Sequence, residues 1–351
     1  MSSFIPGRQL SERLYREVVR PMLPPELPYA AGLLDAGSDV LGFDTEMSID
    51  HGWGPRLQLF LHEEDLSMIR KCLEALPQEF GGFPTFYDKN EDGSSRLGGG
   101  EFHRVETTTP SAFFLSYLGF DPANGVAPAD WLATPEQKLK TVIQELFYDS
   151  LGLRAIQDRL AYYPDDVWRY QMASVWQRIG QEEHLVGRAG YVGDELGASI
   201  IAARLVRDMM RLGFLTERTY APYPKWFGTA FAQLRCAGQL APLLQAVLDA
   251  RGWKDRDARL ASVYEAVARM HNALGLTEPL PNKALPFFSR PFSVIHLHRD
   301  FAGAIIAGVS DPQVRLIAEH DSIGRIDVFS DNTDLVSHLE WRPKVRALYE
   351  R

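Results

Sequence analysis

The spacing of hydrophobic positions changes along this chain. Up to about residue 120, short apolar runs of strand length alternate with helical segments, as at 29–34 and 56–62. From about residue 135 onward, apolar positions recur at helical spacing, and Leu205 and Met209 share one stripe of the segment 198–213. This order favours an α+β architecture, in which a mixed sheet with helices is followed by a larger all-helical domain.

Individual elements follow from the same spacing and from the residues that begin or end them. Thr109-Pro110 and Thr134-Pro135 are typical of helix starts, and Gly119 is typical of a helix end. The pattern predicts strands at 29–34, 56–62 and 101–107. It predicts helices at 11–22, 65–76, 109–119, 167–181, 198–213, 227–234, 241–250, 256–274, 301–319 and 332–349, with one more starting at 134–136.

A segment rich in Pro and Gly separates the two halves of the chain. The stretch LGFDPANGVAPADW, residues 118–131, carries two of each, and we place a connection between domains near residues 120–133. We therefore expect an α/β domain at 1–125 and a helical domain at 126–351. A second Pro-rich segment, 279–291, crosses between helices of the later half.

Composition narrows the classes of function. The 351 residues include 46 acidic and 37 basic side chains, a net charge of −9, which argues against broad binding to nucleic acid or anionic membranes. The two cysteines lie far apart, so they predict no disulfide framework or zinc site. The first residues lack the apolar core of a signal peptide, and no apolar run approaches the ~20 residues of a membrane span. We expect a cytoplasmic protein.

The stretch 37–56 carries the best candidate chemistry. It opens with Gly37-Ser38 and then places four acidic side chains within twelve positions, 39–50. A Gly-Ser turn lets the backbone approach phosphate oxygens, and the hydroxyl can donate a hydrogen bond. Carboxylates can hold the divalent metal that offsets charge during phosphoryl or nucleotidyl transfer.

The same stretch resembles a known superfamily. It is similar to polymerase-β-type nucleotidyltransferases, whose signature is Gly-Ser followed by Asp-x-Asp or Asp-x-Glu entering a strand. Here the order is Gly-Ser, a loop, carboxylates and then the apolar segment RLQLFL. Several longer motifs resemble the DUF4037 family, and together they extend over nearly the whole chain. They are GSDVLGFD, DHGWGPRLQLF, YYPDDVWRY, GDELGA, YAPYPKWFGTAF and GRIDVFSDNTD. The resemblance implies a nucleotidyltransferase-like first domain, Mg2+, a nucleoside triphosphate and a helical domain that closes the cleft.

The signature transfers unevenly onto this sequence. Gly37 and Ser38 match the turn. Asp50 lies twelve positions after Ser38 and just before the second strand, which makes it the first choice for a metal-binding carboxylate. The second carboxylate would then stand at position 52, where the family pattern often has Asp and this chain has Gly52.

A second register and a third carboxylate stay open. Asp44 and Glu46 form a true Asp-x-Glu, only six positions after Ser38 and without a strand directly behind it. Glu106, at the end of the strand 101–107, is the candidate third carboxylate, or else a solvated strand end. His51 either contacts a phosphate or orders the loop.

The helical half offers a base and further phosphate contacts. Glu183 lies in GQEEHLVGRAGYVGDELG, which resembles a junction facing a cleft, and it is the candidate catalytic base; Glu182, Asp194 and Glu195 are the other acidic candidates there. Lys225, between Pro224 and Trp226, and Arg188 are the candidate nucleotide-binding cations. Lys225 is equally well interpreted as a surface lysine beside a core tryptophan. Arg204 and Arg207 are additional candidates.

Two functions follow from these features. The first is a nucleotidyltransferase that moves a nucleoside monophosphate from a triphosphate to an acceptor hydroxyl, with a small molecule as the expected acceptor. The second is a catalytically weak or inactive nucleotide-binding protein of the same fold, which Gly52 favours. A transferase acting on transfer RNA ranks below both, because the sequence shows no basic face.

Overall fold

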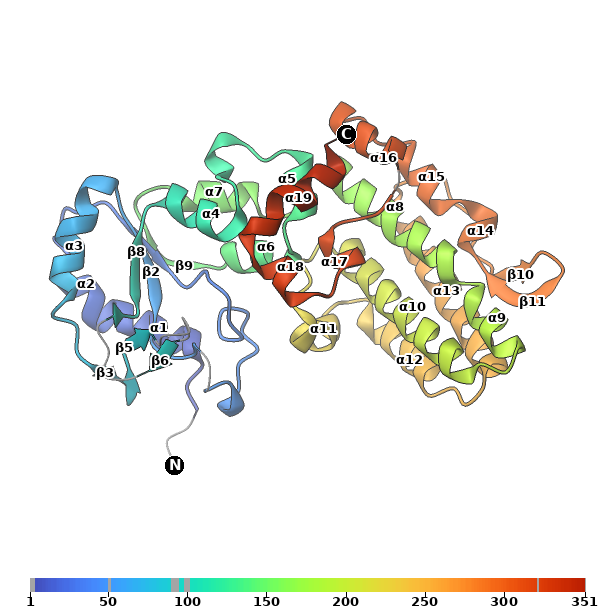
Figure 1. Cartoon of the computed structure of the whole chain (residues 1–351), viewed down its shortest axis with the longest axis horizontal. Helices are drawn as coiled ribbons and strands as arrows, with labels where there is room; N and C mark the ends of the chain where they lie inside the picture. The colour runs from blue at the N-terminus through green and yellow to red at the C-terminus, as the bar shows by residue number, and fades with distance from the viewer. Residues whose placement is uncertain (1–3, 50–51, 90–94, 98–101, 321, 351) are drawn as a thin grey trace. The chain divides into compact units, whose positions relative to one another are not determined.

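The computed structural model describes residues 4–49, 52–89, 95–97, 102–320 and 322–350, and the chain forms two compact units (Figure 1). The first unit comprises Met1–Val126 and Gln137–Ala161, and the second comprises Ala127–Glu136 and Tyr162–Arg351. The architecture is α+β, with a mixed sheet in the first unit and most of the helices in the second.

A four-stranded mixed sheet is the centre of the first unit. Its order is β8 (Val105–Thr108), β2 (Leu57–Phe60), β1 (Ala30–Gly32) and β9 (Leu146–Asp149). β1 runs antiparallel to both β2 and β9, whereas β2 and β8 are parallel. Every residue of β1 and β2 is buried, which explains why both strands read as unbroken apolar runs in the sequence.

Helices cover this sheet and complete its core. The N-terminal helix consists of α1 (Gly7–Leu14), the π-helical turn η1 (Tyr15–Val19) and α2 (Arg20–Met22). The next helical elements come after β2 and are η3 (Glu63–Asp65) and α3 (Leu66–Leu73). Leu14 and Val19 of the first helix and Ile69 of α3 share one buried cluster with Leu57 and Leu59 of β2. The alternating inward side chains of β2 thus hold helices of the first unit onto the sheet.

The remaining elements of the first unit are short. They are η2 (Glu46–Ser48), β3 (Glu79–Phe80), β4 (Phe83–Pro84), β5 (Phe86–Lys89), β6 (Ser95–Leu97), β7 (Phe102–His103), α4 (Pro110–Leu118), η4 (Pro122–Asn124) and α7 (Leu153–Arg159). α4 begins and ends where the sequence predicts, because the Thr109 hydroxyl caps the Ala112 amide and Gly119 adopts a left-handed φ of 89°.

Residues 137–161 correct the expected division of the chain. The sequence assigns them to a helical domain spanning 126–351, but they pack with the first unit. β9 lies in this segment and pairs with β1, and the amide of Ser150 donates to the carbonyl of Tyr29. A pairing between residues more than a hundred positions apart leaves no trace in local periodicity. α6 (Glu136–Val142) starts at the division between the units.

Helices α8 (Asp165–Glu182), α10 (Glu195–Thr216) and α13 (Trp253–Leu274) form the body of the second unit, and α12 (Ala237–Leu248) lies along α13 (Figure 1). The other helices are α5 (Pro128–Ala133), α9 (Leu185–Tyr191), α11 (Pro224–Phe231), α14 (His296–Arg299), α15 (Phe301–Ile306), α16 (Pro312–His320), α17 (Ile326–Phe329), α18 (Thr333–Ser337), η5 (Leu339–Trp341), α19 (Arg342–Arg346) and η6 (Ala347–Tyr349). None of the described helices is both long and apolar enough to cross a membrane.

A hairpin corrects the expectation that this part of the chain is all-helical. β10 (Leu285–Phe287) and β11 (Arg290–Val294) pair antiparallel within the segment predicted as a Pro-rich crossing. The carboxylate of Asp257 in α13 accepts hydrogen bonds from the amide and the hydroxyl of Ser293, at 3.1 and 2.7 Å, which anchors the hairpin. Proline inside β10 and β11 hides the strand pattern from sequence reading.

Candidate functional site

The Gly37-Ser38 turn follows β1 at one end of the sheet. The carbonyls of Gly37 and Ser38 accept bonds from the amides of Leu41 and Phe43, at 3.3 and 2.8 Å, and these bonds close the turn. A Cβ at position 37 would lie 2.2 Å from Asp39 Oδ1, so the turn needs glycine there. The structure thus gives a physical reason for the first residue of the predicted phosphate turn.

Arg56 holds this turn from the strand beside it. Its Nη2 lies 3.0 Å from Asp35 Oδ1 and 3.0 Å from the carbonyl oxygen of Ala36, and its Nη1 pairs with Asp39. Burial lowers the pKa of Arg56, but the charges of Asp35 and Asp39 outweigh burial and raise it above the usual value. Arg56 therefore stays charged and fixes the backbone on both sides of Gly37.

Gln58 and Glu106 extend the same row of polar groups. Arg56 and Gln58 are two positions apart, so their side chains project from the same face of the β2 segment. Gln58 Oε1 accepts from the Leu34 amide at 2.9 Å, and Gln58 Nε2 donates to Glu106 Oε2 at 3.4 Å. β2 and β8 pair with Gln58 opposite Glu106, which explains this contact.

Beside the buried Asp39, this edge carries the carboxylates of Asp35, which pairs with Arg56, and Glu106, which accepts from Gln58. Partial burial raises the pKa of Glu106, the bond from Gln58 opposes that rise, and the charge of Asp35 adds to it. The side chain of Asp35 is 32% exposed, and Glu106 also reaches solvent. Glu106 is among the carboxylates predicted from the sequence, whereas Asp35, two positions before Gly37, is not.

The two acidic residues of the alternative register lie in a different setting. Asp44 Oδ2 accepts from the Gly7 amide at 2.7 Å and from Trp53 Nε1 at 2.8 Å, so this carboxylate anchors the start of α1 and a tryptophan. Glu46 is exposed at the start of η2. Asp50, the first choice from the sequence, and His51 lie outside the described residues.

The loop that follows Asp50 is tied to the sheet by Arg104. Arg104 Nη1 donates to the Trp53 carbonyl at 2.9 Å, and Nη2 donates to the Gly52 carbonyl. Gly52 has a φ of 67°, a left-handed conformation that favours glycine, and a Cβ there would meet no atom within 4 Å. Glycine in place of the expected carboxylate therefore suits the backbone of this turn.

Three candidates from the later half have distinct surroundings. Glu183, predicted to face a cleft, is instead fully buried: its Oε2 accepts from the Ile295 amide at 2.7 Å and its Oε1 from the Leu297 amide at 2.9 Å. Lys225 is exposed, with Nζ 4.9 Å from the ring centre of Trp226, and Arg188 is exposed on α9. Because its carboxylate caps the chain at Ile295–Leu297, Glu183 has no access to an acceptor.

The donor set at the sheet edge suits a hard divalent cation in part. Among the described residues, no group of three or more His, Cys, Asp or Glu side chains lies close enough together to hold a metal ion. Asp35 and Glu106 supply carboxylate oxygen, which Mg2+ prefers, and Mg2+ commonly takes one or two protein carboxylates together with phosphate oxygens. These two residues would hold the ion if it binds at this edge.

Comparison with known families finds a match over part of the chain. Residues 131–227 match the model of a family described as "Domain of unknown function (DUF4037)". The matched segment runs from α5 into α11, and it supports the likeness to DUF4037 that the sequence motifs indicate. No curated protein matches the chain.

Proposed function

We propose that this protein is a nucleotidyltransferase that moves a nucleoside monophosphate from a nucleoside triphosphate to the hydroxyl of a small acceptor. The observation that carries the proposal is the row of side chains beside the Gly37-Ser38 turn, in which Arg56 binds Asp35, Gln58 binds Glu106, and the charge of Asp35 helps to raise the pKa of Glu106. The resemblance of the Gly-Ser stretch to polymerase-β-type enzymes supports the same reading.

Each residue of this edge has a role in the proposed reaction. The turn at Gly37 and Ser38 receives the triphosphate through backbone amides and the serine hydroxyl. Asp35 and Glu106 would hold Mg2+, which offsets the charge that builds on the phosphoryl oxygens. Arg56 keeps Asp35 in place, and Gln58 keeps Glu106 in place. Asp50 remains the candidate for completing the carboxylate set.

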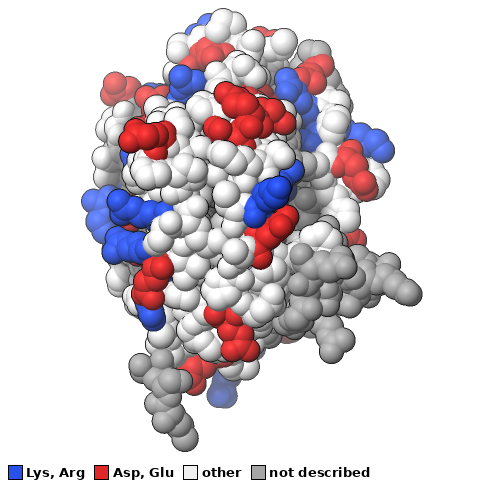
Figure 2. All heavy atoms as spheres, turned by 90° about the vertical axis from the view of Figure 1, so that its left-hand side faces the viewer, with Lys and Arg blue, Asp and Glu red and all other residues white. Residues whose placement is uncertain are grey.

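Charge favours a small acceptor over RNA. The chain carries a net charge of −9. On the face in Figure 2, Lys and Arg side chains are interspersed with Asp and Glu side chains. Binding to RNA draws on clustered basic residues that neutralise phosphates, and a mixed surface lacks that cluster on this face.

A nucleotide-binding protein without transferase activity is the second candidate. The positions that enter β2, where the superfamily signature has its carboxylates, carry Arg56 and Gln58, and position 52 carries glycine. Arg56 is moreover bound to Asp35 and Asp39. This arrangement favours a turn that binds phosphate over one that assembles two metal ions.

One experiment separates the two candidates. The protein is incubated with Mg2+ and each labelled triphosphate in the presence of a metabolite extract, and pyrophosphate release and triphosphate binding are measured together. The variants are Asp35→Asn, Glu106→Gln and Asp50→Asn, with Glu64→Gln as a matched control because Glu64 is exposed in η3, away from the turn.

The outcomes are distinct. Transfer predicts pyrophosphate release by wild type and by Glu64→Gln, with a loss of at least about tenfold in each of the other variants, since removal of a metal carboxylate weakens charge stabilisation. Binding without release supports the second candidate. Absence of triphosphate binding refutes both.

A further inference from the structure

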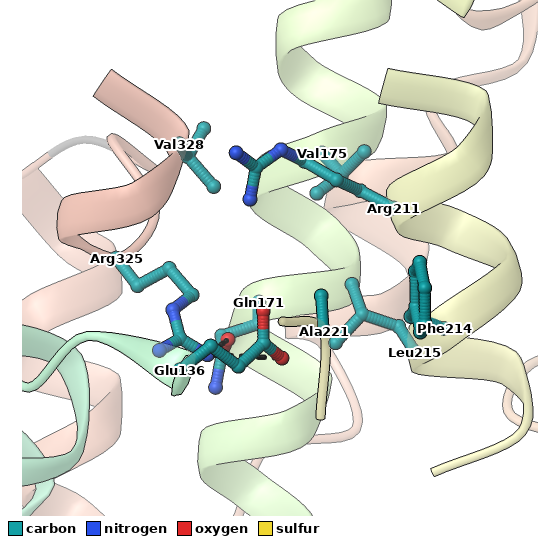
Figure 3. A pocket seen from close by; sticks show the side chains of 9 residues that line it. All are labelled: Glu136, Gln171, Val175, Arg211, Phe214, Leu215, Ala221, Arg325 and Val328. Carbon is teal, nitrogen blue, oxygen red and sulfur yellow. Dashed lines mark hydrogen bonds and ion pairs between the residues drawn. The ribbon is translucent and has the colours of Figure 1, made fainter. Parts of the chain in front are cut away.

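The second unit contains a small pocket that the proposed function does not use. α8 and α10 line it, with Glu136 at the start of α6, Ala221 after α10, and Arg325 and Val328 at α17 (Figure 3). Its empty space is about 280 Å3, including the opening to solvent. Seven of the nine lining residues fall within the segment 131–227 that matches DUF4037, so the pocket belongs largely to the part that the family shares.

One wall of the pocket is electrostatically balanced. Arg325 Nη1 lies 3.1 Å from Glu136 Oε1, and Arg325 Nη2 lies 2.9 Å from Asp327 Oδ2. Nη2 also donates to the carbonyl of Thr134 at 2.9 Å. Figure 3 shows Arg325, Glu136 and Gln171 gathered on this side. Arg325 is therefore a structural cation with its charge already offset.

Two donors at the pocket have no acceptor. Gln171 is 1% exposed, its Oε1 accepts from Arg325 Nη1 at 3.4 Å, and its Nε2 is buried without a partner. The bond from Arg325 fixes the amide orientation, because an arginine can only donate. Arg211 Nε is likewise buried without a partner. Both donors border the same pocket, so a single acceptor placed in it would serve the two of them.

Arg211 also brings a charge that nothing in the pocket offsets by direct contact. Its Nη2 donates to the Asp327 carbonyl, and within the described part of the chain it makes no ion pair with a carboxylate. Phe214 and Leu215 lie beside it, and such apolar neighbours strengthen attraction between a cation and a bound anion. An oxyanion would accept hydrogen bonds from both donors and offset the charge of Arg211.

We propose that this pocket binds the carboxylate or phosphate group of a small molecule, with Arg211 and Gln171 as the donors. The group enters between the Arg211 side and the Arg325 side, and the apolar residues contact the rest of the ligand. The site is independent of the proposed transferase activity, because it uses no residue of the Gly37-Ser38 edge.

Chemical modification of the full-length wild-type protein tests the site directly. Phenylglyoxal, which reacts with arginine, is applied with increasing inorganic phosphate or, in a separate arm, acetate, and with chloride at the same ionic strength as the control. Peptide mass spectrometry follows Arg211 and Arg204, a second arginine of α10 that pairs with Glu182 and does not line the pocket.

The proposal expects saturable protection of Arg211, by about tenfold or more, and unchanged reaction at Arg204. The arm that protects at the lower concentration identifies phosphate or carboxylate as the preferred group. Equal protection of both arginines, or none at Arg211 in either arm, overturns the proposal and leaves water as the acceptor.

Variants give a second readout. Arg211→Gln and Gln171→Leu are expected to lose a saturable rise in melting temperature with the protecting anion, and Arg204→Gln is expected to keep it. Each variant is compared with its own melting temperature in chloride. A rise that persists in Arg211→Gln contradicts the assignment, and if that variant does not fold, the modification of wild type decides. Triphosphate binding should be the same in all three variants, which separates this site from the proposed function.

Discussion

Asp208 in α10 gives a quantitative prediction about stability and pH. This carboxyl is fully buried, and its Oδ2 lies 3.1 Å from Arg178 Nε of α8. Burial raises its pKa from 3.8 to about 6, more than the charges of Arg178, Arg211 and Arg207 lower it. The folded protein therefore holds the Asp208 proton more tightly than the unfolded chain does.

The sign and size of the effect follow from linkage. The folded-state pKa is raised, so the stabilisation is fully present below the unfolded pKa of about 3.8 and disappears as the pH rises through about 6. A shift of roughly two pKa units corresponds to about 3 kcal/mol, of which about 2 kcal/mol is lost between pH 4.5 and 7.5. The side chain is buried, so solvent does not reduce this value substantially.

Asp208→Asn removes the titrating group while keeping its size. We expect the stability of the variant relative to wild type to rise by about 2 kcal/mol from pH 4.5 to pH 7.5. Urea unfolding followed by tryptophan fluorescence measures this difference. The signal comes mainly from the second unit, because Trp53 is the only tryptophan of the seven that lies in the first.

Asp255→Asn is the matched control. Asp255 lies on α13 with an exposed side chain paired to Arg259, so its replacement should change the pH dependence by no more than a few tenths of a kcal/mol. A pH-independent difference between Asp208→Asn and wild type, or one that falls as the pH rises, would show that Asp208 ionises in the folded protein at no cost, and the reasoning would be refuted.

Three further predictions concern other groups. Burial lowers the pKa of His296 to about 4, so stability is lost as the pH falls from about 6.5 toward 4; the acid limb of a pH–melting curve should be shallower in His296→Gln. Arg56→Met leaves Asp39 buried without its partner and should lower unfolding stability by about 3–5 kcal/mol, measured by urea unfolding, whereas the double change with Asp39→Leu should cost less. Gly52→Asp places a carboxylate where a Cβ meets no atom, at a backbone cost of roughly 1–2 kcal/mol. The variant should bind Mg2+ more tightly than wild type in calorimetry, and an unchanged affinity would place the ion elsewhere.

Local patterns in the sequence predict much of the fold. The apolar runs at 29–34 and 56–62 predicted β1 and β2, and helical spacing predicted α8, α10 and α13 to within a few residues. β9 was not predicted because it pairs with β1, more than a hundred positions away, and the β10–β11 hairpin was not predicted because proline lies inside both of its strands. The expected boundary at residue 125 differs from the division into compact units at residues 137–161, which join the first unit and carry β9, the partner of β1.

The candidate site was partly readable. Gly37 and Glu106 can be proposed from the sequence because a turn glycine and a carboxylate on a strand have local signatures. Asp35 and Arg56 were missed, since their importance lies in a contact across some twenty positions. Glu183 was misread because its sequence gave no sign that the amides of 295–297 would bury it.

A crystal structure with Mn2+ in place of Mg2+ and a non-hydrolysable triphosphate analogue tests the central claim most directly. The account predicts an anomalous manganese peak at coordination distance from both Asp35 and Glu106, with the phosphates against the Gly37-Ser38 turn. Triphosphate bound at that turn without metal at either carboxylate would support the binding-only candidate. Metal and triphosphate bound away from Asp35, Glu106 and the turn would contradict the account.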